Sequence, residues 1–241
     1  MENKKRNLIL QVDVKLDNQP SGFKRFQPNR DMYDLSEYQA KKYANIWGAD
    51  YYKIEDLSYL PDKHPTYQRF KMFEMLEYDN ILYLDMDAII MPVCPNPFPI
   101  FEKFVFSAVR NHDWDNMNDK NIAYMKSSSE KYGTENYKSF CAGVMFLTKE
   151  FLIEVGDNWR KYLYTFDKGE HDQDMINQLV VDHYGGKYND MMPEWGAWFR
   201  NGKYIDHMGS KLRKLDFEIG KYTKKKNIEY NLGNDDLSKF M

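Results

Sequence analysis

The chain has 241 residues, of which 42% are hydrophobic and 16% aromatic, enough for the core of one ordinary domain. Its net charge of −3 argues against bulk binding to nucleic acid, which requires a basic surface. The two cysteines, Cys94 and Cys141, form no metal-ligand pattern, and no stretch of about 18 apolar residues occurs. We therefore expect a soluble, cytoplasmic protein whose membrane contacts, if any, are peripheral.

Strand and helix signals alternate along the first third of the chain. The expected elements are a strand at 8–14, a loop at 17–30, a helix at 35–47, a strand at 49–54, a helix from 65 to about 79 and a strand at 81–84. Ser36 is the expected N-cap of the first helix, and Gly48 is its expected stop.

The rest of the chain continues the alternation. Further strands are expected at 104–109, 140–147 and 203–207, and a helix at 172–183. Residues 113–138 are polar and show no clear period, which predicts an active-site loop or lid with a short helix. Strands that alternate with helices imply an α/β fold of three layers around a mainly parallel sheet.

The segment Ile81-Leu-Tyr-Leu-Asp-Met-Asp87 ends an apolar run on two carboxylates. Residues at i and i+2 of an extended segment point the same way, so Asp85 and Asp87 can converge on one hard cation. The carboxyl edge of an α/β sheet is where such folds bind ligands, and a divalent metal there suits a phosphate-bearing substrate. A turn acid or a helix cap is the alternative for an isolated Asp-x-Asp.

Three further groups are expected near these acids. Arg69 lies in the first turn of the helix that precedes their strand, where it could hold a pyrophosphate or anchor an acidic side chain. Asp172 and Gln173 open the later helix and suit a hydroxyl-rich substrate, although a first-turn acid is also explained by the helix dipole. His207 ends the last strand and is a legitimate third ligand for Mn²⁺.

Five motifs follow one another between residues 8 and 211. They are Arg69, Tyr83-Leu84-Asp85-Met86-Asp87, Cys141-Ala142-Gly143-Val144-Met145, Asp172-Gln173-Asp174-Met175-Ile176-Asn177 and His207-Met208-Gly209-Ser210-Lys211. In this order they resemble the nucleotide-sugar glycosyltransferases of GT-A fold, especially the glycogenin and lipopolysaccharide-galactosyltransferase type. The resemblance implies a GT-A, Rossmann-like domain over residues 1–210, with residues 211–241 as a basic C-terminal tail.

The resemblance also implies roles for individual residues. Asp85, Asp87 and His207 would bind Mn²⁺, with Mg²⁺ as an alternative, and the metal would hold the diphosphate of a UDP-sugar donor. The residues implied to contact the donor are Arg69, Asp13, Ala142, Gly143, Gly209 and Lys211. Asp172 and Gln173 would lie beside the transferring sugar, which moves to a glycan, glycolipid or protein hydroxyl with retention of anomeric configuration.

The sequence departs from the family pattern at two places. Cys141 replaces the asparagine of an "NAGV" strand, which removes an amide that could bind a sugar hydroxyl. The late "HxxGxxK" motif is shortened, because only one residue separates His207 from Gly209 and Gly209 from Lys211. These changes leave the donor sugar and the phosphate contacts open.

The same residues leave two other functions open, and the basic tail allows a membrane contact. A haloacid-dehalogenase-like phosphatase also begins from a strand ending in Asp-x-Asp, and a non-catalytic protein could bind a nucleotide sugar or glycan with the same residues. Residues 211–226 hold seven Lys or Arg against two acids, so this segment could dock on an anionic membrane, or it could be a solvated terminal helix or a frayed tail.

Overall fold

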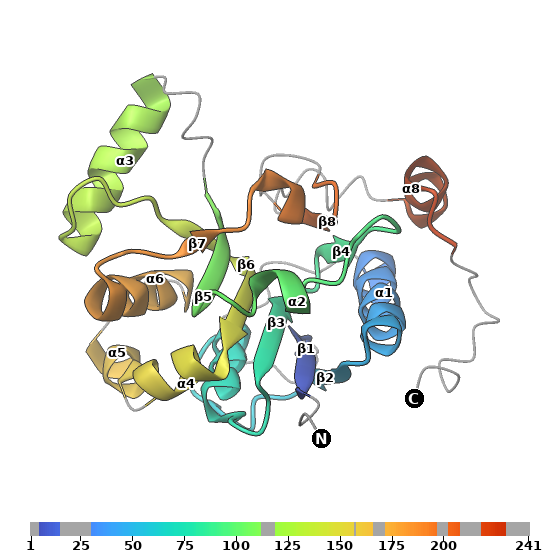
Figure 1. Cartoon of the computed structure of the whole chain (residues 1–241), viewed down its shortest axis with the longest axis horizontal. Helices are drawn as coiled ribbons and strands as arrows, with labels where there is room; N and C mark the ends of the chain where they lie inside the picture. Colours follow the sequence, from blue (N-terminus) through green and yellow to red (C-terminus); the bar gives the residue numbers. More distant parts are fainter. Residues whose placement is uncertain are drawn as a thin grey trace.

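The computed structural model describes residues 5–14, 30–111, 119–156, 158–165, 172–196, 202–207 and 218–229 (Figure 1). The strands are β1 (Asn7–Val12), β2 (Asp50–Ile54), β3 (Asn80–Leu84), β4 (Ala88–Ile90), β5 (Phe106–Arg110), β6 (Phe140–Thr148), β7 (Asn189–Asp190) and β8 (Ile205–His207). The helices are α1 (Arg30–Trp47), α2 (Phe98–Phe101), α3 (Asp119–Tyr132), α4 (Lys149–Val155), α5 (Trp159–Thr165), α6 (Asp172–Tyr184) and α8 (Ile219–Lys226), with 3-10 helices η3 (Pro65–Glu74) and η4 (Pro193–Trp195).

Six strands form the central sheet in the order β2-β1-β3-β6-β5-β7. β1 pairs in parallel with β2 and β3, and β5 pairs in parallel with β7. β6 is antiparallel to both of its neighbours, β3 and β5. Five strands therefore share one direction and β6 opposes them, which confirms the mainly parallel sheet. The start of β6 consequently lies beside the carboxyl end of β3.

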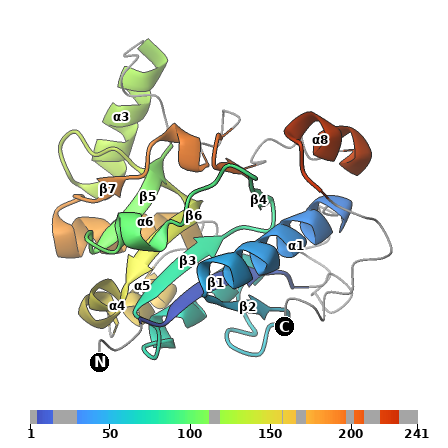
Figure 2. The same cartoon turned by 45° about the vertical axis from the view of Figure 1, so that its right-hand side comes forward.

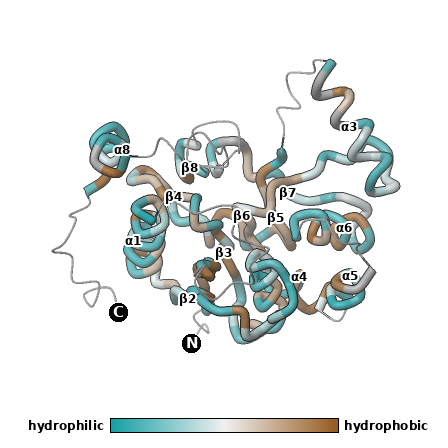
Figure 3. Tube along the Cα trace, turned by 180° about the vertical axis from the view of Figure 1, so that it is seen from behind, coloured by the Kyte–Doolittle hydropathy of each residue, from teal (hydrophilic) through white to brown (hydrophobic). Residues whose placement is uncertain are grey.

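Alternating side chains of the strands build one core on each face of the sheet. On one face, Leu8, Tyr83 and Met145 pack with residues of η3, α4, α5 and α6. On the other face, Ile9 and Leu82 pack with residues of α1 and α2. Every residue of β6 is buried, as its almost wholly apolar sequence indicates. The hydropathy colouring agrees, since brown is concentrated on the central strands while α1 and α8 are largely teal (Figure 3). The expected three layers are present.

A second, two-stranded sheet joins β4 to β8 and was not expected from the sequence. The pairing is antiparallel and places Ala88 opposite His207. A buried chain of hydrogen bonds ties β4 to the main sheet: the Ser36 hydroxyl donates to Ala88 O at 2.8 Å, and Gln11 Nε2 donates to Ser36 Oγ at 3.0 Å. Ser36 lies inside α1, which begins at Arg30, so the prediction that it caps the helix is wrong. Its hydroxyl bonds a neighbouring strand instead of its own helix.

The polar segment at 113–138 contains more helix than a loop or lid would require. α3 spans 14 residues and projects from the body of the protein (Figure 1). It is anchored near its end, where the Tyr132 hydroxyl donates to Asp174 Oδ1 at 2.7 Å and Lys131 Nζ lies 2.8 Å from Asp174 Oδ2. A helix that contacts the domain mainly at one end needs no long apolar face, which explains why its sequence lacks a clear period.

The described part of the basic C-terminal segment is a helix that packs against the domain. α8 lies beside the N-terminal part of α1 and near β4 in both views (Figures 1 and 2). An apolar cluster joins these elements and consists of Met32, Leu35, Ile89, Met91, Ile219 and Ile228. The apolar residues of α8 are therefore already covered by protein. None of the helices in the described ranges is long and apolar enough to cross a membrane.

Candidate active site

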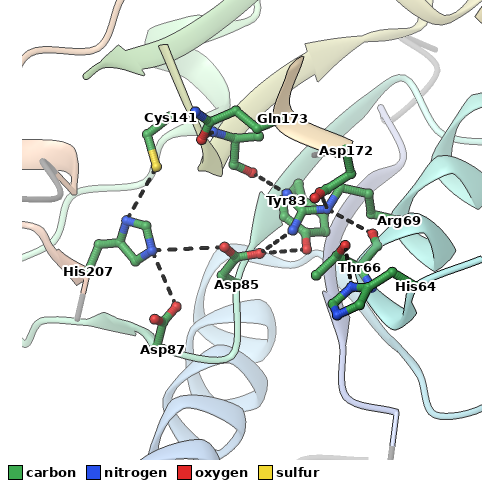
Figure 4. A network of polar contacts seen from close by, with 11 residues as sticks. His64, Thr66, Arg69, Tyr83, Asp85, Asp87, Cys141, Asp172, Gln173 and His207 are labelled. Atoms are coloured by element: carbon green, nitrogen blue, oxygen red, sulfur yellow. Dashed lines mark hydrogen bonds and ion pairs between the residues drawn. The ribbon is translucent and has the colours of Figure 1, made fainter. Parts of the chain in front are cut away.

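The two acids that follow β3 lie in a tight turn. The backbone N–H of Ala88 donates to Asp85 O at 2.9 Å, so residues 85–88 are not extended as the sequence suggested. The turn leads directly into β4, whose first residue is paired with His207. As a result, Asp87 Oδ1 lies 3.2 Å and Asp85 Oδ2 lies 3.9 Å from His207 Nε2 (Figure 4). Strand pairing, rather than i, i+2 alternation, brings these side chains together.

Asp85, Asp87 and His207 form a group suited to a metal ion, with one ligand atom from each lying within 4.8 Å of the others. Two carboxylates and one imidazole are ligands that Mn²⁺ accepts. Gly143 on β6 leaves the space open, because a Cβ there would lie 2.3 Å from His207 Cε1 and 2.8 Å from Asp85 Oδ2. The residues present therefore fit a divalent cation, and any larger residue at 143 would crowd its ligands.

The two oxygens of Asp85 have different surroundings. Oδ1 accepts hydrogen bonds from the Tyr83 hydroxyl at 2.7 Å and from an Arg69 guanidinium nitrogen at 2.9 Å. Oδ2 faces His207. The pair of donors thus fixes the carboxylate so that its second oxygen points into the metal-ligand group. Tyr83 was expected only as part of the motif and was given no role, although its place on β3 two residues before Asp85 could have indicated one.

His207 is buried, with 2% of its surface exposed, and lies between Cys141 and the acids. Its Nδ1 is 3.7 Å from Cys141 Sγ, opposite the side that faces Asp87 (Figure 4). Burial lowers the pKa of His207, but the Cys141 sulfur and Asp87 outweigh burial and raise this pKa well above its ordinary value. A protonated imidazole is therefore favoured beside the two carboxylates.

Arg69 joins the metal-ligand group to the first turn of α6. Its side chain is almost fully buried and donates to Asp85, to Thr66 O at 3.1 Å and to Ala142 O at 2.8 Å. Its Nε also lies 2.7 Å from Asp172 Oδ2. Burial lowers the pKa of Arg69, but Asp172 and Asp85 outweigh it and raise this pKa above its ordinary value. Of the two roles left open for Arg69, the structure shows the anchoring of acidic side chains.

Asp172, Gln173 and Ala142 are brought together beside Arg69. Asp172 is buried in the first turn of α6, and its Oδ2 makes the ion pair with Arg69 without a hydrogen bond. Gln173 Oε1 accepts from the Ala142 backbone N–H at 3.2 Å (Figure 4). The antiparallel course of β6 explains this meeting, because it delivers the backbone of Ala142 to the edge at which β3 ends.

The other predicted donor contacts are not brought to this group by any observed contact. Asp13, at the end of β1, is buried and paired with Arg30 through two hydrogen bonds of 3.0 and 2.8 Å. Arg30 was missed because no local pattern reveals a partner 17 residues away. Gly209 and Lys211 lie outside the described residues.

Comparison with known proteins finds similarity in the fold and not in the sequence. No protein-family model matches the sequence, and no curated protein matches it. Among solved structures, a glycosyltransferase involved in glycosylation of the major capsid of PBCV-1 aligns with a TM-score of 0.50 and 12% identity, covering 93% of this chain and 100% of that one. The bifunctional glycosyltransferase WbbM aligns with a TM-score of 0.51 and 11% identity, covering 81% of this chain and 40% of that one. The chain has the fold of the GT-A glycosyltransferases, as the sequence motifs led us to expect.

Proposed function

We propose that this protein is a metal-dependent glycosyltransferase. It transfers a sugar from a nucleotide diphosphate sugar, with UDP favoured by the sequence motifs, to a hydroxyl of a glycan, glycolipid or protein. The observation that carries the proposal is the convergence of Asp85, Asp87 and His207 at the end of β3, with Gly143 leaving space among them. The fold supports it, because the similar solved structures are glycosyltransferases.

Asp85, Asp87 and His207 would hold Mn²⁺ or Mg²⁺. When bound, such an ion neutralises the diphosphate of the donor as negative charge develops on the leaving group. The chain prepares the ligands before binding: Tyr83 and Arg69 hold one oxygen of Asp85, so its other oxygen is available to the cation. This arrangement reduces the reorganisation required when the cation binds.

Asp172, Gln173 and Ala142 form the proposed sugar side of the site. The Asp172 carboxylate and the Gln173 amide can orient sugar hydroxyls, and the small Ala142 leaves room for a sugar face. The proposed reaction retains the anomeric configuration of the sugar. It follows a front-side route, in which no side chain forms a covalent bond to the sugar. Gly209 and Lys211 are proposed to contact the diphosphate.

A donor panel tests this function. The protein is incubated with UDP- and GDP-sugars in Mn²⁺ or in EDTA, and the released nucleoside diphosphate is measured. We expect slow release from one donor, abolished by EDTA and by Asp87→Asn, and unchanged in the exposed control Asp62→Asn. NMR of the product from that donor then reports the anomeric configuration.

Binding measured in the same plate separates the alternatives. A nucleotide sugar that stabilises the protein in Mn²⁺ without any release, even with added glycan acceptors, would indicate a non-catalytic binder. Release of inorganic phosphate from simple phosphate esters would instead support the phosphatase alternative. If no donor releases nucleoside diphosphate and none stabilises the protein in Mn²⁺, the glycosyltransferase proposal is contradicted.

A further inference from the structure

Asp206 precedes His207 on β8 and belongs to a separate buried ion pair. Because successive residues of a strand point to opposite sides, Asp206 faces away from the metal-ligand group. Its side chain has 0% exposure. Its Oδ2 accepts a hydrogen bond of 2.8 Å from the Tyr222 hydroxyl and lies 3.0 Å from Lys226 Nζ. Both partners come from α8, so the C-terminal helix holds the residue next to a proposed metal ligand.

The sheet that carries His207 is too small to fix this residue by itself. β4 and β8 contribute three residues each, and β8 has β4 as its partner strand. A two-stranded sheet of this size is marginal unless it packs against other elements. β4 is supported by the Ser36 hydrogen bond from α1. On β8, Asp206 provides the corresponding polar contact to a helix.

α8 is itself firmly placed. Ile219, its first residue, and Ile228, just after its last turn, are buried against residues of α1 and β4. Asn227 adopts a left-handed conformation with φ of 54° and ends the helix, and Ile228 N–H then donates to Thr223 O at 2.9 Å. The Lys226 side chain is only 16% exposed, whereas Lys224 in the same turn is exposed. One lysine of the basic run is thus directed inward, where a buried carboxylate receives it.

We propose that Lys226 and Tyr222 are positioning residues for His207, acting through Asp206 and the backbone of β8. The helix α8 would hold β8 so that His207 Nε2 stays aligned with Asp85 and Asp87 before a cation binds. The inference rests on the proposed metal site, and it assigns the C-terminal basic segment a role in forming that site. Only the side of α8 that contacts Asp206 takes part in this role, and the exposed lysines of the helix do not.

Mn²⁺ titration of the full chain tests this inference. Lys226→Met removes the charge at similar length, Tyr222→Phe removes one hydroxyl, and Lys224→Met is the matched control on the same helix. We expect the dissociation constant for Mn²⁺ to rise about tenfold in the first variant and by less in the second, as is typical when a residue supporting a ligand is lost. Lys224→Met should bind as the wild type does, and Lys226→Arg should restore most of the affinity.

Amide hydrogen exchange in EDTA provides a second measurement that does not depend on metal. Lys226→Met should accelerate exchange at Ile205–His207 more than in the central strand β3, whereas a uniform loss of stability would accelerate both. Wild-type Mn²⁺ affinity in folded Lys226→Met, with unchanged exchange in β8, would overturn the inference. If the wild type itself binds no Mn²⁺, the proposed metal site fails, and the exchange measurement alone decides whether α8 holds β8. Should Lys226→Met not fold, Tyr222→Phe carries the same comparison.

Discussion

The two sides of β8 face acids in opposite electrostatic situations, of which Asp206 and Asp87 are buried and Asp85 is partly exposed. On one side, Asp206 meets Lys226 at 3.0 Å, so a cation of the chain itself neutralises it. On the other side, Asp85 and Asp87 share the titratable His207, and Arg69 reaches only the Asp85 oxygen that faces away. Buried carboxylates are costly unless they are paired. The contrast teaches that an acid with its own lysine serves the fold, while acids whose oxygens face a titratable imidazole are suited to an external cation.

Asp87→Asn breaks the metal side of this comparison and should have the largest effect. Loss of one charged ligand removes several kcal/mol of charge stabilisation, so we expect turnover to fall by roughly 1,000-fold. Nucleoside diphosphate release in Mn²⁺ measures it, with Asp62→Asn as the exposed control. Turnover within a factor of about three of the wild type would contradict the assignment of Asp87 as a ligand.

Gly143→Ala disturbs the metal-ligand group but keeps all three of its ligands. The new methyl group would lie 2.3 Å from His207 Cε1, so the imidazole must move. Overpacking of this kind costs about 1–3 kcal/mol, and we expect Mn²⁺ affinity to fall roughly 10- to 100-fold. Isothermal titration calorimetry checks this value. Ala142→Gly, which leaves the ligand space unchanged, is the neighbouring control, and equal affinities for the two variants would refute the crowding argument.

Asp206→Asn breaks the fold side of the comparison. It leaves Lys226 and the Tyr222 hydroxyl without their charged acceptor, which we expect to lower the free energy of unfolding by about 2 kcal/mol. Denaturant unfolding in EDTA measures this loss free of any metal contribution, and Asp62→Asn should change it by less than about 0.5 kcal/mol. A stability equal to that of the wild type would show that this ion pair does not support the fold.

The pH dependence of Mn²⁺ affinity sharpens the comparison on the metal side. Its effect for each pH unit is the smallest of the four predicted here. A metal ligand must be the neutral imidazole, and the pKa of His207 is raised well above its ordinary value. Mn²⁺ affinity should therefore fall about tenfold for each pH unit below the pKa of His207 in the folded protein. In EDTA the sign reverses: stability contributed by protonated His207 is present at low pH and lost as pH rises through this pKa. His207→Gln should abolish both trends, and a pH-independent affinity in the wild type would contradict them.

The predictability of the fold followed the length and regularity of each signal. The almost wholly apolar strand β6 and the amphipathic α6 were predicted within one residue at each end, because their patterns are long. β4 and β8, with three residues each, were missed or misplaced at their boundaries, since such short strands form only through tertiary contacts.

The site was predictable in its residue types more than in its geometry. Asp85, Asp87 and His207 were expected together, but the expected alternation along an extended segment is replaced by a turn and a strand pairing. The partners of Arg69 illustrate the remaining difficulty. A sequence shows that a cation lies near the strand end, whereas its choice of Asp85 and Asp172 depends on burial that only the folded chain creates.

The reversed direction of β6 has a consequence for how this protein can diversify. The floor of the site, Cys141 to Gly143, lies near the beginning of β6, which runs antiparallel to the other five described strands of the central sheet and is buried in the middle of that sheet. A change there must satisfy both the core and the ligand space, as the short distances at Gly143 show. Substitutions are therefore tolerated more easily in the projecting helix α3 than in the floor. A substitution in the floor, such as Cys141 in place of the asparagine of the resembling motif, is therefore accepted only where it keeps both the buried strand and the ligand space intact.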